Sequence, residues 1–351
     1  MRDSSSASTS ISRRSFLRTA TATSLATTAI PSIAQSAACI LGQGAFRYRP
    51  VPEWGVLGST TPVKNCHGIV CDNEGHIILL TDHTANNVII YEKSGKLVHK
   101  WGTSYPGAHG LSIVNEASRQ VLYITDLQRH RVVKTTLDGK QLEEWCWPEM
   151  SGKYTREEEY RPSWTIHFPD GSFYVLDGYG KDYIPHYDST GSFVKLLGGA
   201  EGGIKHWGPH GGMADIRPEK AESMLIAMSD QQHLLRMDRE GNIQKTIPLP
   251  GGNPRQIRKH GDHYFVGHLA DNWPSDRNSR GFLSVLNSEL QIVSNIGGTN
   301  PIYNNDGILQ PMKNNSSVFL HPHDLVVDSE DSIYVAQFSS GQTYPIKLER
   351  V

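Results

Sequence analysis

The sequence predicts an all-β protein built as a ring of short, similar sheets. Runs of about five apolar residues alternate with Gly-containing turns, such as Ser94-Gly95 and Asp138-Gly139. A histidine recurs at the head of four units: Cys66-His67-Gly68, Ala108-His109-Gly110, Pro209-His210-Gly211 and Pro322-His323-Asp324. Units of roughly 40–50 residues made of short strands are typical of a β-propeller, in which each unit forms one blade.

Six such units can be aligned along the chain. The first has strands at 67–72, 77–82, 87–91 and 97–101, and the second at 109–114, 121–126, 131–134 and 142–145. The third has them near 162–164 and at 173–177, 186–187 and 193–196, and the fourth begins at 210 and continues at 224–228 and 234–237. The fifth, weaker unit uses 254–255, 264–266 and 282–285, and the sixth 323–328, 333–335 and 345–348. No stretch sustains a 3.6-residue apolar period, so helices are not expected.

The sixth unit ends after its third strand. Residues 48–55, which precede the first unit, are expected to supply the missing outer strand and close the ring. Residues 298–320 could hold a degenerate seventh unit, which is the alternative to six blades. If there is no seventh unit, residues 298–320 form a long loop, as residues 148–161 and 271–280 also do. Long loops on one face of a ring usually shape a site there.

The N-terminal residues 1–38 are predicted to be a twin-arginine export signal. Arg13-Arg14 is followed by Phe16-Leu17 and then by a mildly apolar stretch that ends in small residues. A Ser/Thr-rich tail with a chance Arg pair is the alternative. We expect residues 39–351 to form one propeller domain that is exported, for example to the periplasm. No later segment has the roughly 18 apolar residues that could span a membrane.

The chain has 351 residues and a formal net charge of -2, which gives no sign of a nucleic-acid partner. We expect a monomer that acts on a small-molecule or peptide-like substrate.

Three histidines head alternate units and are predicted to bind a metal. His109, His210 and His323 open the second, fourth and sixth units, which would lie about 120° apart in a six-bladed ring. Three imidazoles at one point suit zinc and leave a coordination position open. For a single histidine, a hydrogen bond to a neighbouring carbonyl is the alternative. His67 breaks the alternation and is a candidate fourth ligand, proton carrier or channel plug.

Two further residues near these heads could carry chemistry. Asp324 is expected to point into the channel, where a buried carboxylate needs a cation or hydrogen-bond donors, so calcium on the axis and an ordinary hydrogen bond both remain open. Tyr179 follows the second strand of the third unit and could act as a base beside the metal. Stacking on a neighbour is the alternative for this tyrosine.

These motifs together resemble the peptidyl-α-hydroxyglycine α-amidating lyase domain, which belongs to the wider group of NHL-repeat propellers. The resemblance covers most of residues 60–350 and rests on Asp177-Gly178-Tyr179 and the second, fourth and sixth heads. It implies zinc at His109, His210 and His323 and a catalytic role for Tyr179. It also implies a structural calcium held by Asp324 and the main-chain carbonyls of Ile69 and Leu111.

The sequence departs from this family where the substrate carboxylate is held. One expected Arg is replaced within Thr81-Asp82-His83, a second corresponds to Asp230-Gln231, and His321 replaces a Met. Arg255, Arg161 or Lys181 could take over the missing role. We therefore add His67 and Asp82 to the candidate catalytic group, and assign Arg255 and His83 to the substrate.

The resemblance predicts a zinc-dependent lyase, the N-terminal motif predicts that it is exported, and the missing Arg residues predict an altered substrate. A non-catalytic NHL-repeat binding propeller is the alternative from another class, with Trp164, Trp207 and Trp273 as its candidate rim. A metal-dependent, lactonase-like hydrolase is a third, although such sites use acidic and Asn ligands where this chain offers histidines.

Overall fold

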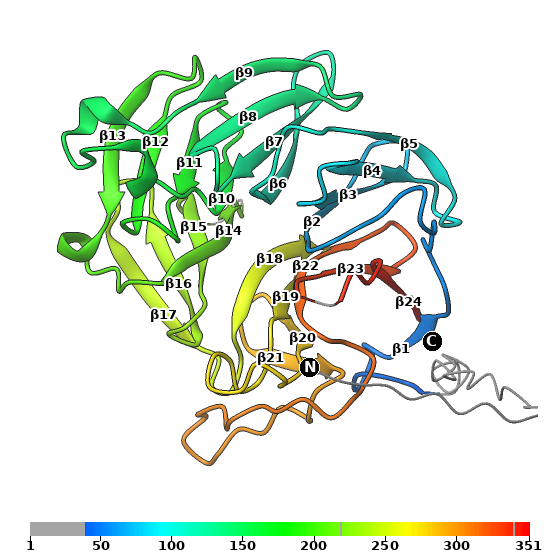
Figure 1. Cartoon of the computed structure of the whole chain (residues 1–351). Coiled ribbons are helices and arrows are strands. Elements are labelled where there is room, and N and C mark those ends of the chain that lie inside the picture. The colour runs from blue at the N-terminus through cyan, green and yellow to red at the C-terminus, as the bar shows by residue number, and fades with distance from the viewer. Residues whose placement is uncertain (1–38, 218–219, 340) are drawn as a thin grey trace, which may run out of the picture. The chain divides into compact units, whose positions relative to one another are not determined.

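The computed structural model describes residues 39–351 except 218, 219 and 340, and the predicted export signal at 1–38 lies outside this part. The described residues form six antiparallel four-stranded sheets arranged as the blades of a propeller (Figure 1). This confirms the all-β, six-bladed prediction. Within the described part, residues 298–320 hold only isolated bridges, at Gly298–Asn314 and Tyr303–Leu309, so they form no seventh blade there.

The first three blades follow one another along the chain. Blade 1 contains β2 (Cys66–Cys71), β3 (Ile77–Thr81), β4 (Val88–Tyr91) and β5 (Leu97–Trp101). Blade 2 contains β6 (Ala108–Asn115), β7 (Gln120–Asp126), β8 (Arg131–Thr136) and β9 (Gln141–Trp145). Blade 3 contains β10 (Trp164–His167), β11 (Phe173–Leu176), β12 (Tyr183–Tyr187) and β13 (Phe193–Gly198).

The other three blades complete the ring. Blade 4 contains β14 (Pro209–Asp215), β15 (Ser223–Met228), β16 (His233–Asp238) and β17 (Ile243–Pro248). Blade 5 contains β18 (Pro254–His260), β19 (His263–His268), β20 (Phe282–Leu286) and β21 (Ile292–Ile296). Blade 6 contains β22 (Pro322–Val327), β23 (Ile333–Gln337), β24 (Ile346–Arg350) and, as its fourth strand, β1 (Tyr48–Val51).

Blade 6 joins the two ends of the described chain. β1 pairs antiparallel with β24, with Tyr48 opposite Arg350 and Val51 opposite Lys347. The N-terminal strand therefore supplies the outer edge that the last three strands lack.

The described residues contain no α-helix, only three short 3₁₀ turns: η2 (Glu149–Ser151), η3 (Glu157–Glu159) and η4 (Ala200–Gly202). None of the described helices is long and apolar enough to cross a membrane.

The hydrophobic core lies between blades and not on the axis. Each of six buried apolar clusters draws its members mainly from two neighbouring blades. Second strands such as β3 and β15 are buried at every position because both of their faces pack on other blades. The six inner strands contact one another in turn around the ring. This arrangement leaves the axis to polar side chains.

Candidate metal centre and adjoining cavity

The inner strands of five blades carry a β-bulge at their heads. The register shifts next to His67, His109, His210, Arg255 and His323. A bulge adds a residue to one strand and turns its side chain out of the regular alternation. It therefore frees these side chains from the sheet face, so that they can turn towards the mouth of the channel.

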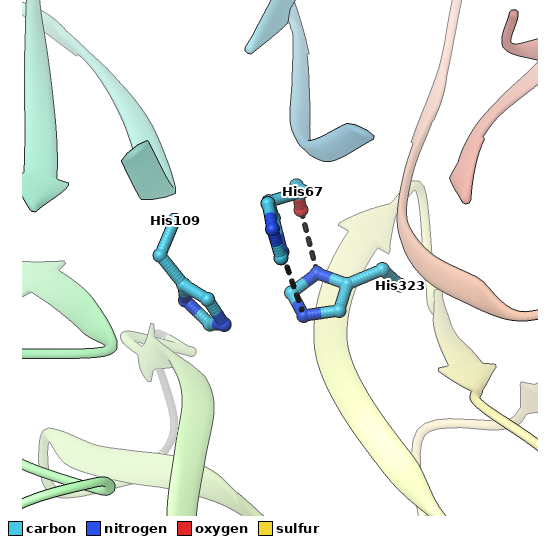
Figure 2. Close-up of side chains that lie close together, drawn as sticks. All are labelled: His67, His109 and His323. Carbon is cyan, nitrogen blue, oxygen red and sulfur yellow. Dashed lines mark hydrogen bonds between the residues drawn. The ribbon is translucent and has the colours of Figure 1, made fainter. Parts of the chain in front are cut away.

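Four imidazoles meet at this mouth, all less than a tenth exposed. The ring centroids of His109, His210 and His323 form a nearly equilateral triangle with sides of 4.9, 4.8 and 4.7 Å. His67 lies 4.7 Å from His109 and 4.8 Å from His323 (Figure 2). One nitrogen from each of His67, His109 and His323 lies within 4.8 Å of the other two, so these three could bind one metal ion.

The three histidines of the even-numbered blades share one hydrogen-bond pattern. Their Nδ1–H groups donate to the head carbonyl of the next blade: His109 to Ser163 at 2.9 Å, His210 to Arg255 at 3.0 Å and His323 to His67 at 2.7 Å. A carbonyl can only accept, so Nδ1 carries the proton and Nε2 of the neutral ring keeps its lone pair. This is the arrangement of metal-binding histidines in general.

The electrostatics of the mouth keep these rings neutral. Burial, joined by nearby histidines and Arg255, lowers the pKa of His109, His210 and His323 well below the usual value. Nε2 of His109 is buried without a hydrogen-bond partner among the described residues. A buried lone pair without a donor suits a metal ion, so the donor set fits zinc.

His67 and His210 occupy different positions at the edges of this cluster. Nδ1 of His67 lies 3.5 Å from Nε2 of His323, and no carbonyl of the described residues fixes the tautomer of His67. Nε2 of His210 instead accepts the Tyr179 hydroxyl at 2.9 Å. Two ligand sets are therefore possible. The distances between nitrogens favour His67, His109 and His323, whereas the shared hydrogen-bond pattern favours His109, His210 and His323.

Tyr179 is placed against His210 by a tight turn. A Cβ on Gly178 would lie 2.1 Å from the carbonyl oxygen of Pro209, so the turn can pass blade 4 this closely only with glycine. The Asp177 carboxylate accepts the backbone N–H of Arg161 at 2.6 Å and of Lys181 at 2.7 Å, which fixes both ends of the turn. Burial raises the pKa of Asp177 to about 7 despite these donors.

Beside the imidazoles lies a cavity of about 330 Å³, a size suited to a small ligand. His210, His323, Tyr179 and Arg255 line it. Arg255 is only 7% exposed, and its Nε has no hydrogen-bond partner in the described part of the chain. Burial lowers the pKa of this guanidinium, and the charge of Arg277 adds to the effect. Arg255 is therefore a buried guanidinium that forms no ion pair with a carboxylate among the described residues.

The other two candidate replacements for the missing Arg residues are placed differently. Lys181 forms an ion pair with Glu159 at 2.7 Å. Arg161 lies over the Tyr179 ring, with 5.9 Å between its guanidinium carbon and the ring centroid, and does not line the cavity. Of the three, only Arg255 lines it.

The structure places Asp82 and His83 in hydrogen bonds of their own loop. The Asp82 carboxylate accepts the backbone N–H of Asn65 at 2.9 Å and its side-chain amide at 2.8 Å, so both oxygens are used within a loop. His83 accepts the backbone N–H of Ala85 at 3.1 Å in its own turn. Neither residue lines the cavity. Their sequence position at the end of a second strand gave the expectation, and the charge of Asp82 still opposes the lowering of the His109 pKa. The catalytic role of Asp82 and the substrate role of His83 therefore stay predictions.

The expected calcium site is also corrected, because a side chain supplies the positive charge there. The Arg258 guanidinium donates to both carboxylate oxygens of Asp324, at 3.0 and 2.6 Å. It also lies 3.4 Å from the carbonyl oxygen of Ile69 and 3.3 Å from that of Leu111. The oxygens assigned to calcium therefore surround a guanidinium, which also lies 5.1 Å from the centroid of the Trp164 ring.

Three charged or aromatic residues of the channel and cavity were not predicted from the sequence. Arg258 was missed, although a charged residue in an inner strand requires a counter-charge and Asp324 was available. Arg277 and Phe338 line the cavity from loops, whose direction no strand pattern predicts. Trp207 and Trp273 line it too, whereas Trp164 is buried and forms no rim.

Together, the fold and the site define a six-bladed β-propeller with a histidine-lined mouth. Solved structures with the same fold include a streptogramin B lyase, at 13% identity and a TM-score of 0.56, over 88% of this chain and 99% of that one. Virginiamycin B lyase from Staphylococcus aureus matches at 15% identity and a TM-score of 0.55, over 87% and 100%.

A protein of unknown function from Bacteroides thetaiotaomicron matches at 10% identity and a TM-score of 0.57, over 89% of this chain and 76% of that one. At such identities the likeness concerns the fold alone. Neither a protein-family model nor a curated protein matches the sequence.

Proposed function

We propose that this protein is an exported, zinc-dependent lyase similar to the peptidyl-α-hydroxyglycine α-amidating lyases, with an altered substrate site. The observation that carries the proposal is the repeated Nδ1 hydrogen bond of His109, His210 and His323, which presents three neutral imidazoles beside Tyr179. Export through the twin-arginine pathway is part of the proposal and rests on residues 1–38.

In this proposal the substrate is a carbinolamide, R–CO–NH–CH(OH)–COO⁻. Its C–N bond breaks while the hydroxyl oxygen becomes the carbonyl of glyoxylate, and the hydroxyl proton is transferred to the nitrogen to give R–CO–NH₂. No water, oxidant or reductant is consumed. Zinc at the imidazoles would polarise a neighbouring oxygen and favour the anionic form of a nearby phenol.

The remaining roles fall to residues of the cavity. Tyr179, in its phenolate form, takes the hydroxyl proton and returns it to the leaving nitrogen. Burial raises the pKa of Tyr179, while the charges of Arg255 and Arg161 oppose this rise. Arg255 holds the carboxylate in place of the arginines that the sequence lacks. His67 lies next to His323 as an additional ligand or proton carrier.

The direct test is turnover of N-benzoyl-α-hydroxyglycine to benzamide and glyoxylate by protein loaded with zinc. Turnover should stop after chelation and return with zinc. Tyr179→Phe should lower it by about 100-fold without a loss of bound zinc. Bound zinc without turnover would contradict the lyase and favour the metal-dependent hydrolase. The absence of both would favour a binding propeller.

A further inference from the structure

The cavity beside the imidazoles carries an excess of positive charge at one wall. Arg255 and Arg277 both line it, and the charge of Arg277 helps to lower the pKa of Arg255. Asp230 is the one carboxylate among the lining residues that the structure describes, and it accepts a hydrogen bond from the side-chain amide of Asn253 at 3.3 Å. Two neighbouring cations with a single carboxylate near them leave room for one bound anion.

Aromatic rings line the cavity on two sides of this charge. Trp207 precedes blade 4 and lies 5.6 Å from Tyr179, measured between ring centroids. Trp273, from the loop after β19, lies 6.3 Å from Phe338 of blade 6. Trp207 and Tyr179 therefore come from blades 3 and 4, and Trp273 and Phe338 from blades 5 and 6, with Arg255 at the head of blade 5 between them.

Both aromatic walls are held in place by the surrounding structure. Trp207 has a φ of 58°, a left-handed conformation that is rare for a bulky residue and is maintained only where the surroundings impose it. The ring nitrogens of His321 lie 3.1 Å from the carbonyl oxygens of Phe338 and Ser279, so this histidine links blade 6 to the loop of Trp273. Arg277 stacks on Trp273, with 4.1 Å between its guanidinium carbon and the ring centroid.

We propose that the substrate carries a carboxylate attached through a short linker to a planar aromatic group. The carboxylate binds Arg255, with Arg277 nearer the rim, and the aromatic group lies between Trp207 and Trp273. This inference rests on the proposed function for the identity of the reacting group and adds the class of substrate. A cationic substrate is disfavoured because it would meet two guanidiniums.

The test is equilibrium binding of hippurate (N-benzoylglycine), which lacks the reactive hydroxyl and so needs no turnover. Hippurate should bind at least about tenfold more tightly than N-acetylglycine, which lacks the ring, or benzamide, which lacks the carboxylate. Arg255→Met should weaken hippurate binding by about tenfold or more. Arg119→Met, which removes an exposed arginine of the β6–β7 turn, should have no effect.

Trp207→Leu keeps the test decisive if Arg255→Met fails to fold, because it should remove the preference for hippurate over N-acetylglycine. Equal binding of these two compounds to the native protein, or unchanged binding by the Arg255→Met protein, would overturn the inference. Hippurate binding without turnover of N-benzoyl-α-hydroxyglycine would overturn the proposed reaction and keep the substrate class. Turnover with no preference for an aromatic group would keep the proposed reaction and overturn the substrate class.

Discussion

Two polar clusters lie in the central channel of this propeller and differ in how completely their groups are paired. In the first, the Arg258 cluster, the guanidinium contacts a carboxylate from β22 and carbonyls from β2 and β6, so its charge is balanced within the chain. In the mouth cluster, Nε2 of His109 and Nε of Arg255 are buried without partners among the described residues. Because burying an unpaired polar group costs free energy, the Arg258 cluster stabilises the ring, whereas the mouth cluster has polar atoms that could bind a ligand.

The largest expected effect is on the free energy of unfolding, through the Arg258 cluster. Asp324→Leu leaves the Arg258 guanidinium without its counter-charge and should lower the free energy of unfolding by about 3–5 kcal/mol. The double variant Arg258→Met/Asp324→Leu removes both charges and should recover most of this loss. Urea denaturation measures all three proteins.

Calcium should not change the stability that the Arg258 cluster provides. Adding calcium to the native protein should leave its unfolding transition unchanged, because the guanidinium already occupies the place among these oxygens. A saturable rise in stability with calcium would refute the assignment of Arg258.

The next largest effect is on zinc affinity, through the mouth cluster. His109→Ala removes the imidazole whose Nε2 has no other partner, and should weaken zinc binding by at least about 100-fold, or 2.7 kcal/mol. His99→Ala removes an exposed histidine of the outer strand β5 and should bind zinc as the native protein does. Competition with a chromogenic chelator measures both affinities. Equal affinities would exclude His109 as a ligand.

A smaller effect separates the two candidate ligand sets. If His210 completes the set, as the shared Nδ1 hydrogen bonds indicate, His210→Ala should weaken zinc binding more than His67→Ala. The opposite order would assign the site to His67, His109 and His323, whose nitrogens are closest to one another.

The smallest effect is on how the stability of the metal-free protein falls at acidic pH. Burial, together with the charges of Arg255 and Lys64, lowers the pKa of His67 from 6.5 to about 3. The unfolded chain therefore binds this proton first, and stability present above pH 6.5 is lost as the pH falls towards 3. His67→Gln should remove up to about 1.4 kcal/mol per pH unit from this loss. His99→Gln should follow the native profile, and an unchanged profile for His67→Gln would argue against a neutral buried ring.

The repeats made the blades predictable because apolar strands and Gly turns are local signals. The alternate heads also placed His109, His210 and His323 together, since equivalent positions converge in a ring. The need of Arg258 for a counter-charge was a sequence signal for the partner of Asp324, but strand periodicity alone could not place it, because the bulge at Arg255 alters which side chains of β18 face the axis. The positions of Asp82 and His83 depended on turn hydrogen bonds that strand periodicity does not encode.

The central claim is that the imidazoles of the mouth, among them His109 with its unpaired Nε2, bind one transition metal ion. X-ray absorption at the zinc edge, on protein loaded with one equivalent of zinc, tests it most directly. The account predicts a spectrum dominated by imidazole nitrogens at about 2.0–2.1 Å, with His109→Ala losing that signal. A spectrum of fully hydrated zinc in the native protein would contradict it.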